Sequence, residues 1–286
     1  MEHLLYIGTL IAVWTIVALA ANLVIGYTGM MSMGQAAYLG IGAYATATLN
    51  ILLGVNFYLA LLIGSMTAAV VGAITLLPLL RIGGFYFALA TLGVNFVFFD
   101  IFHNLGPRVE GSEGLYGLQL PDLLASSAPR FATTTAVAIA CALLCQAIVT
   151  SPLGRALRAT RDRPDALAAL GKDPRRYQLL IWTFAAGLSG LAGGLYAATL
   201  FYIDPTLFTL DASILVLVYI GVGGLASTAG SVLGVILLIV FNESLRFLGL
   251  PSQLVGPFQQ AIYGLLLILL MIFRRRGLVG EYDFAE

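Results

Sequence analysis

Charge is what this sequence has least of. Only 10% of its residues are charged, whereas an average soluble domain carries roughly 25%. Hydrophobic residues make up 60% of the chain, and its mean hydropathy is +0.97. So few charges cannot cover a surface in water, which excludes a soluble globular protein. The formal net charge is zero, so electrostatics gives no reason to expect a nucleic-acid partner.

The stretches without charge are long enough to cross a bilayer. A helix needs about 20 apolar residues to span a hydrocarbon core about 30 Å thick. The runs that lack Asp, Glu, Lys and Arg are 3–80, 131–154, 177–203, 212–242 and 247–273. The first run is far too long for a secretory signal peptide. The sequence therefore predicts an all-α polytopic membrane protein, one domain over 1–286, surrounded by a lipid bilayer.

Glycine and proline divide the apolar parts of the chain into segments near 4–25, 31–50, 57–80, 84–103, 131–150, 178–200, 208–246 and 257–273. The seventh is too long for one span, and Gly221–Gly230 is predicted to break it, because glycine costs about 1 kcal/mol per helical position. Gly26–Gly42 fits either close helix packing or a broken or re-entrant helix, whereas Gly187–Gly194 favours packing. We expect about eight (seven to nine) transmembrane helices, with one or two broken or re-entrant segments.

Ionisable groups are absent from the centres of the predicted spans. Ion-coupled secondary transporters usually keep such groups at mid-membrane. Asp100 and His103 lie three residues apart near one span end, and Glu243 and Arg246 do so near another. Each pair is expected to neutralise itself across one helical turn at the interface. An ion-coupled secondary transporter remains an alternative, but the sequence supplies no carrier for the ion.

The residues needed for catalysis are also missing. Gly187–Gly190 fits the Gly-x-Ser-Gly pattern of rhomboid-type proteases, whose histidine base comes later in the chain. Here both histidines, His3 and His103, come earlier, so an intramembrane protease is rejected. Cys141 and Cys145 lie four residues apart in an apolar run and are expected to be packing residues rather than metal ligands.

The chain also lacks a phosphate-binding loop, which ends in Gly-Lys-Ser/Thr. Its single lysine, Lys172, follows Gly171 but precedes Asp173. The chain is therefore not expected to be an enzyme, and any ATP-driven pumping must use an ATPase on another chain.

The charge that is present gathers in one stretch. Ser151–Arg176 holds 10 of the 28 charged side chains (14 cations plus 14 anions), seven of them cations. Cations flank the cytoplasmic ends of membrane helices. We therefore predict that 151–176 is a cytoplasmic loop, on the same side as Arg81 and Arg274–Arg276. This assignment makes 104–130 an extracytoplasmic loop.

Within the charged loop, Arg163–Gly171 reads as a short capped helix. Pro164 suits the first helical position, Asp165 suits the positive end of the helix dipole, and Gly171 suits the stop. The predicted apolar face consists of Leu167, Ala168 and Leu170. A topology signal needs only cations, so a capped helix with an apolar face points to docking in a partner's groove.

Several stretches together resemble a known family. The loop sequence Gly154–Gly171 is similar to the coupling loop of ABC importer permeases of the branched-chain amino acid family. Asn22–Leu49 resembles the N-terminal signature of the M-type membrane subunit, and Arg81–Asn104 and Leu188–Leu238 resemble its later segments. Their order and spacing identify the chain as a member of that permease family over nearly its whole length.

The resemblance implies the permease subunit of an ATP-driven importer for branched-chain or other hydrophobic amino acids in the bacterial cytoplasmic (inner) membrane. Its implied partners are a second homologous permease in a heterodimer, two cytoplasmic ATPases and an extracytoplasmic solute-binding protein. ATP and Mg would be bound by the ATPases, and this chain would bind no cofactor. Close relatives carry urea or short amides, so these cargoes are an alternative.

The expected site residues form three sets. The ATPase-coupling set is Arg155, Arg158, Arg161, Asp162, Pro164, Asp165, Leu167, Leu170 and Gly171. The substrate-path set is Ser32, Gln35, Thr91 and Asn95, which are uncharged polar residues among glycines or aromatics; simple interhelical hydrogen bonds are the alternative for the last two. The binding-protein docking set is Glu110, Ser112 and Glu113, in a loop where the family usually has Thr-Gly-Gly-x-Asn-Gly.

Overall fold

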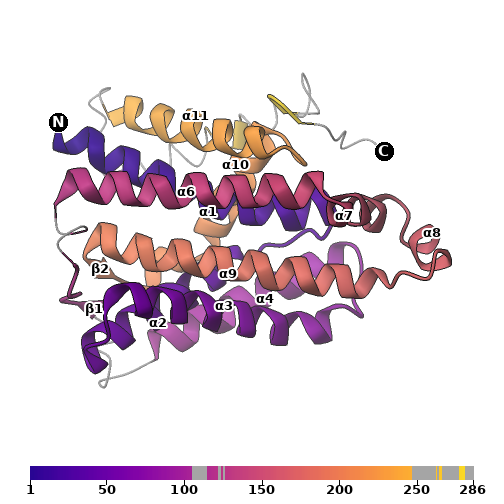
Figure 1. The fold of residues 1–286 in the computed structure, drawn as a ribbon, viewed down its shortest axis with the longest axis horizontal. Coiled ribbons are helices and arrows are strands. Elements are labelled where there is room, and N and C mark those ends of the chain that lie inside the picture. Colours follow the sequence, from indigo (N-terminus) through magenta and orange to yellow (C-terminus); the bar gives the residue numbers. More distant parts are fainter. Residues whose placement is uncertain are drawn as a thin grey trace.

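The computed structural model describes residues 1–104, 115–121, 124, 126–246, 262, 264–265 and 277–280. Over these residues the chain is a bundle of long helices (Figure 1). The helices long and apolar enough to cross a membrane are α1 (Glu2–Thr28), α2 (Gln35–Leu53), α3 (Phe57–Leu79), α4 (Phe85–His103), α6 (Ser127–Thr150) and α9 (Pro174–Leu200). The predicted all-α membrane fold is confirmed.

The break predicted at Gly221–Gly230 is confirmed as well. Helix α10 (Leu210–Gly223) and helix α11 (Thr228–Arg246) are bent by 115° relative to each other. The last carbonyls of α10 accept hydrogen bonds from the backbone of Leu278 and Val279, with N–O distances of 3.0 Å. The predicted span 257–273 lies outside the described residues.

The core of the bundle is formed by α1, α2 and α9. Helix α9 packs against all of α1, α2 and α3, and every residue from Ala12 to Thr28 is buried. A helix that is buried on all sides is enclosed by protein rather than lipid. In contrast, α3, α4 and α6 each leave large apolar side chains exposed, among them Met66, Phe96 and Leu143.

Glycines allow the core helices to approach closely. A Cβ added at Gly193 would lie 1.9 Å from the carbonyl oxygen of Leu39, and one at Gly42 would lie 2.2 Å from the Cα of Gly190. The prediction of close packing for 187–194 is therefore confirmed. The segment 26–42 combines both of its alternatives, because residues 29–34 are a non-helical connection and the glycines after them pack tightly.

The bundle has two distinct ends (Figure 1). One carries α7 (Pro152–Asp162) and α8 (Pro164–Ala169). The other carries the chain's N-terminus and a short antiparallel pair, β1 (Leu115–Tyr116) and β2 (Tyr202–Ile203), followed by the 3₁₀ helix η1 (Pro205–Phe208). The Glu243 carboxylate lies 2.8 Å from His3 Nε2, a contact with α1 that local spacing could not reveal. The side chain of Arg246, with which Glu243 was predicted to pair, lies outside the described residues.

Candidate functional site

The charged loop folds into two helices, of which only the second was predicted. The unpredicted helix, α7, starts where the Ser151 hydroxyl accepts a hydrogen bond from the Leu153 amide at 3.1 Å. Its buried face packs against α1, α6 and α9 and consists of Gly154, Ala156, Leu157 and Thr160. Their three- to four-residue spacing is the helical signal, which the many arginines of this stretch obscured.

Helix α8 has the ends that the sequence predicted. Pro164 occupies its first turn, and Gly171 has a φ of 75°, the left-handed conformation typical of a helix stop. The amide of Lys172 donates to the carbonyl of Leu167 at 3.3 Å, which closes the end of the helix. The loop thus holds a rigid, capped projection at one end of the bundle.

The predicted apolar face of α8 is wrong in one respect. Leu167 is only 4% exposed, because it packs inward where α8 lies against α7 and α9, whereas Leu170 is 76% exposed. Two residues three apart share a face only while the helix continues. Here the helix ends at Ala169, so Leu170 falls in the cap and points elsewhere. Leu170 and Ala168 remain available to a partner, whereas Leu167 holds α8 in place.

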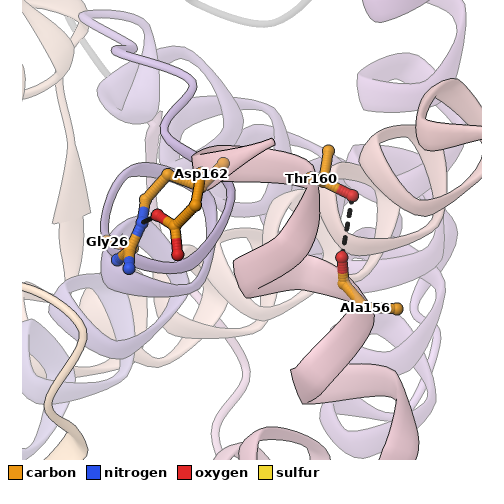
Figure 2. A network of polar contacts seen from close by, with 5 residues as sticks. Gly26, Ala156, Thr160 and Asp162 are labelled. Carbon is orange, nitrogen blue, oxygen red and sulfur yellow. Dashed lines mark hydrogen bonds and ion pairs between the residues drawn. The ribbon is translucent and has the colours of Figure 1, made fainter. Parts of the chain in front are cut away.

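The cations of the coupling set point in two directions. Arg155 is exposed, as are Pro164 and Asp165 on α8. Arg161 turns inward: its Nη1 donates to the Gly26 carbonyl at 2.6 Å and its Nε to Asp162 at 2.7 Å (Figure 2). The Arg158 guanidinium lies 5.5 Å from the ring centroid of Tyr27.

Arg161 stabilises the end of α1. A cation there interacts favourably with the negative end of the helix dipole and with carbonyls that have no helical partner. Gly29 ends the helix with a φ of 72°, and its amide donates to the carbonyl of Ile25 at 3.2 Å. Because the Arg161 side chain is only 12% exposed, it joins α7 to the buried core helix instead of facing a partner.

A pocket of about 350 Å³ lies at the same end of the bundle. It is enclosed by the connection that follows α1, the turn between α3 and α4, and the start of α9. Its lining includes Thr28, Met31, Arg81 and Gln178. The pocket therefore borders the segment 29–34, which leads to the buried start of α2.

The predicted path residues come together around that start. Ser32, Gln35, Thr91 and Asn95 are all at most 3% exposed. Three of them accept hydrogen bonds that hold this region together. Thr91 Oγ1 accepts from the Met33 amide at 3.0 Å, and Ser32 Oγ accepts from the Gly34 amide at 3.3 Å. Gln35 Oε1 accepts from Ser189 Oγ at 3.3 Å.

Two serines of this cluster were missed by the sequence reasoning. Ser213 on α10 accepts the hydrogen bond of the Ala36 amide at 3.0 Å. Ser189 on α9 bonds to Gln35, so the serine of the Gly-x-Ser-Gly stretch is paired with a side-chain amide. The first amides of a helix have no intrahelical partner, so a helix that starts inside the bundle needs acceptors from neighbouring helices. A serine within an apolar run was the sequence signal that could have indicated such an acceptor.

Asn95 differs from the rest of the cluster. Neither its Oδ1 nor its Nδ2 has a hydrogen-bond partner among the described residues, although both atoms are buried. It lies one turn beyond Thr91 on the same face of α4. An unpaired buried amide costs free energy, so this position favours a ligand or a water molecule as the missing partner.

Over the described residues the chain is a bundle of membrane-length helices, with a capped projection at one end and a buried polar cluster inside it. The family model described as "Branched-chain amino acid transport system / permease component" matches residues 3–273. The chain belongs to this permease family. It is therefore a multi-pass membrane protein and a transport subunit rather than a catalytic enzyme.

The similar curated proteins carry corresponding names. The high-affinity branched-chain amino acid transport system permease protein LivM of Escherichia coli is 29% identical over 300 residues, covering 96% of this chain and 69% of that protein. A probable LivM of Methanocaldococcus jannaschii is 25% identical, covering 93% and 90%. A probable LivH of the same organism is 27% identical, covering 68% and 66%. No solved structure matches the chain.

At the opposite end of the permease, Asn50 fixes the chain near β1. Its side chain donates to the carbonyls of Val55 and Gln119 and accepts from the Gln119 amide at 2.7 Å. The pKa of the nearby Asp204 carboxyl is lowered, because hydrogen bonds from Thr206 and Tyr202 outweigh the opposing effect of burial. The predicted docking residues Glu110, Ser112 and Glu113 lie outside the described residues.

Proposed function

We propose that this permease is the M-type membrane subunit of an ATP-driven importer for branched-chain amino acids. The observation that carries the proposal is α8, a capped helix with an exposed apolar tip at Leu170. It projects from the bundle beside α7, and α7 is joined to the core helix α1 through Arg161. A helix in this position can contact a partner subunit, and the contacts of α7 with α1 can transmit the partner's movement to the transmembrane core.

The proposal includes an orientation. The end with α7, α8 and Arg81 faces the cytoplasm, since cations flank cytoplasmic helix ends, and the end with β1 and β2 faces the exterior. Both Arg81 and Gln178 border the pocket at the proposed inner end. We assign that pocket to the inner mouth of the path, and the membrane is the bacterial cytoplasmic membrane.

The proposal also includes partners. A homologous second permease would complete the transmembrane pathway, and the similarity to a protein named LivH supports such a pair. Two cytoplasmic ATPases would bind ATP and Mg and dock on α8, and an extracytoplasmic solute-binding protein would deliver the cargo. This chain itself would bind no cofactor.

The cargo path would pass the polar cluster at the start of α2. Of the proposed path residues Ser32, Gln35, Thr91 and Asn95, the last is the best placed to contact cargo, because its amide has no partner among the described residues. The other three would shape the path while satisfying the start of α2. Uncharged groups suit a carrier, since they bind weakly enough to release an amino acid on each cycle.

The test is reconstitution of the complete transporter in proteoliposomes. With all four kinds of subunit present, we expect uptake of leucine, isoleucine and valine that requires ATP, and little uptake of urea or acetamide. A complex whose ATPases carry a substitution of the phosphate-binding lysine serves as the control and should not transport. Preferential uptake of urea or acetamide would refute the assignment of branched-chain amino acids as the cargo. Uptake driven by a proton or sodium gradient without ATP would refute the assignment as an ATP-driven importer.

A further inference from the structure

Asn22 joins α1 to the break between α10 and α11. Its side chain is buried. The nitrogen and the oxygen of its side-chain amide both form hydrogen bonds with residues more than 200 positions away in the chain. Nδ2 donates to the carbonyl of Ser227 at 2.8 Å and to the hydroxyl of Ser231 at 2.7 Å, and Oδ1 accepts from the Ala226 amide at 2.9 Å. Both donor hydrogens and the acceptor oxygen of the amide are thus used on one short segment.

This segment needs support from outside. Ala226 has a φ of 57°, a left-handed conformation that is unfavourable for residues other than glycine, and it is buried. Non-helical backbone inside a membrane protein must be satisfied by its surroundings. Within the break, Ser227 already caps α11 by accepting from the Gly230 amide at 3.0 Å. Asn22 supplies further partners from α1.

One turn further along α1, Gly26 contacts two other elements at once. A Cβ at this position would lie 2.5 Å from the Ala226 amide nitrogen, so only glycine lets α1 approach the break so closely. The carbonyl of the same residue accepts the hydrogen bond of Arg161 on α7 (Figure 2). Asn22, Gly26, Arg161, Ala226 and Ser227 therefore form one junction, which we call the α1–break junction.

We propose that Asn22 is a positioning residue for coupling: it fixes the break to the last turns of α1, so that a displacement of α7 moves the α10–α11 pair. The inference rests on the proposed function, which assigns α7 and α8 to the ATPase side. Arg161 passes the displacement to α1, and Asn22 passes it to the break. A second contact supports this route, because the start of α10 holds the start of α2 through Ser213 and Ala36. The route thus leads from the projecting helices to the polar cluster.

The experiment compares two buried asparagines in the complete reconstituted transporter. Asn22→Ala removes the bonds to the break, and Asn50→Ala removes an equally buried amide with three hydrogen bonds at the opposite end. The measurement is the number of leucine molecules taken up per ATP hydrolysed. We expect a decrease of about fivefold or more for Asn22→Ala, the range typical of coupling between sites, and no change for Asn50→Ala. Asn22→Leu, which keeps the approximate size of the side chain without a charge but has no donor or acceptor, should show a similar decrease and replaces Asn22→Ala if that variant does not assemble.

A second readout separates coupling from stability. Ala229 is exposed at the start of α11, and Ala229→Cys provides a site for maleimide labelling. In a complex that carries only this substitution, the labelling rate should change when ATP is added. This response to ATP should disappear when Asn22→Ala or Arg161→Met is added. Because both residues act on the same route, combining the two substitutions should lower the uptake per ATP hydrolysed no further than either one alone.

The outcomes distinguish the two proposals. An unchanged uptake ratio together with an intact labelling response in Asn22→Ala overturns the role of Asn22 and leaves the importer standing. An equal loss in Asn50→Ala also overturns it, because the effect would then follow stability alone. Absence of ATP-driven uptake in the unmodified complex overturns the proposed function, and this inference with it.

Discussion

At the scale of single residues, the buried asparagines differ in what they bond to. Asn22 and Asn50 each make three hydrogen bonds to chain segments that lack regular partners. Asn95 has no partner among the described residues. Removing a bonded amide leaves backbone groups unsatisfied, whereas removing an unbonded one does not. Stability and transport should therefore respond differently to substitutions at these positions.

Asn95→Leu should leave stability almost unchanged and reduce uptake. The leucine has a similar size, and no hydrogen bond among the described residues is lost, so we expect a change of less than about 1 kcal/mol. Thr91→Val, one turn away, leaves the partly buried Met33 amide without its acceptor and should cost about 1–3 kcal/mol. Thermal unfolding in detergent measures the change in stability of both variants. Leucine uptake by the assembled transporter measures the effect on transport, and we expect it to fall about tenfold for Asn95→Leu. Equal destabilisation by both substitutions would make Asn95 a structural residue.

Two glycines provide a matched test of helix packing. Gly193→Ala places a Cβ against the carbonyl of Leu39, where there is no room, and overpacking of this kind costs about 1–3 kcal/mol. Gly93→Ala on α4 meets nothing within 4 Å and should be neutral or stabilising, since alanine favours helix by about 1 kcal/mol. The unfolding temperatures of the two variants in detergent should move in opposite directions or differ clearly. A stable Gly193→Ala protein would contradict the close packing of α2 and α9.

At the scale of elements, local signals predicted the ends of helices well and their surroundings poorly. Pro164 and Gly171 marked the limits of α8, and the glycines of 221–230 marked the break, because both effects are properties of the local backbone. The burial of Leu167 and the bonds of Asn22 to the break depend on segments distant in sequence. No local pattern contains that information.

The predicted path residues show the same limit. Ser32, Gln35, Thr91 and Asn95 were singled out because they are uncharged polar residues among glycines or aromatics. Their individual roles could not be assigned, since the buried start of α2 and its acceptors on α4 and α10 emerge only in three dimensions. Helix α7 was missed for a different reason: its helical spacing is present in the sequence, but its arginines suggested an irregular loop.

The two leucines predicted to share a face of α8 should have opposite effects. Leu170→Asp changes an exposed side chain, so the protein should keep its stability while ATP hydrolysis in the complex no longer drives uptake. Leu167→Asp buries a carboxylate between α8 and its neighbours, which should destabilise the loop by about 3 kcal/mol or more, since buried charges without partners are costly. Unfolding temperature and the ratio of uptake to hydrolysis separate the two effects. Normal coupling in Leu170→Asp would show that the partner does not bind this tip.

At the scale of the whole molecule, the distribution of exposed apolar residues fits a protein that is covered on its sides and free at its ends. The outward faces of α3, α4 and α6 expose large apolar residues, as expected of surfaces that the bilayer covers. Charged and exposed residues gather at the end with α7 and α8. The orientation of the protein in the membrane therefore determines which compartment, and which partner proteins, the α7–α8 end faces.

Cysteine labelling tests this direction. Ala169 on α8 and Gln119 near β1 are both exposed and lie at opposite ends, while the native Cys141 and Cys145 are buried and can be replaced by alanine for a background without thiols. A maleimide that cannot cross membranes should label Gln119→Cys in intact cells and Ala169→Cys only after permeabilisation. The cations of 151–176 are the physical reason, because translocating them is unfavourable. Labelling of Ala169→Cys in intact cells would put α8 outside, where no ATPase could reach it, and would refute the coupling role of the whole α7–α8 end together with the proposed importer.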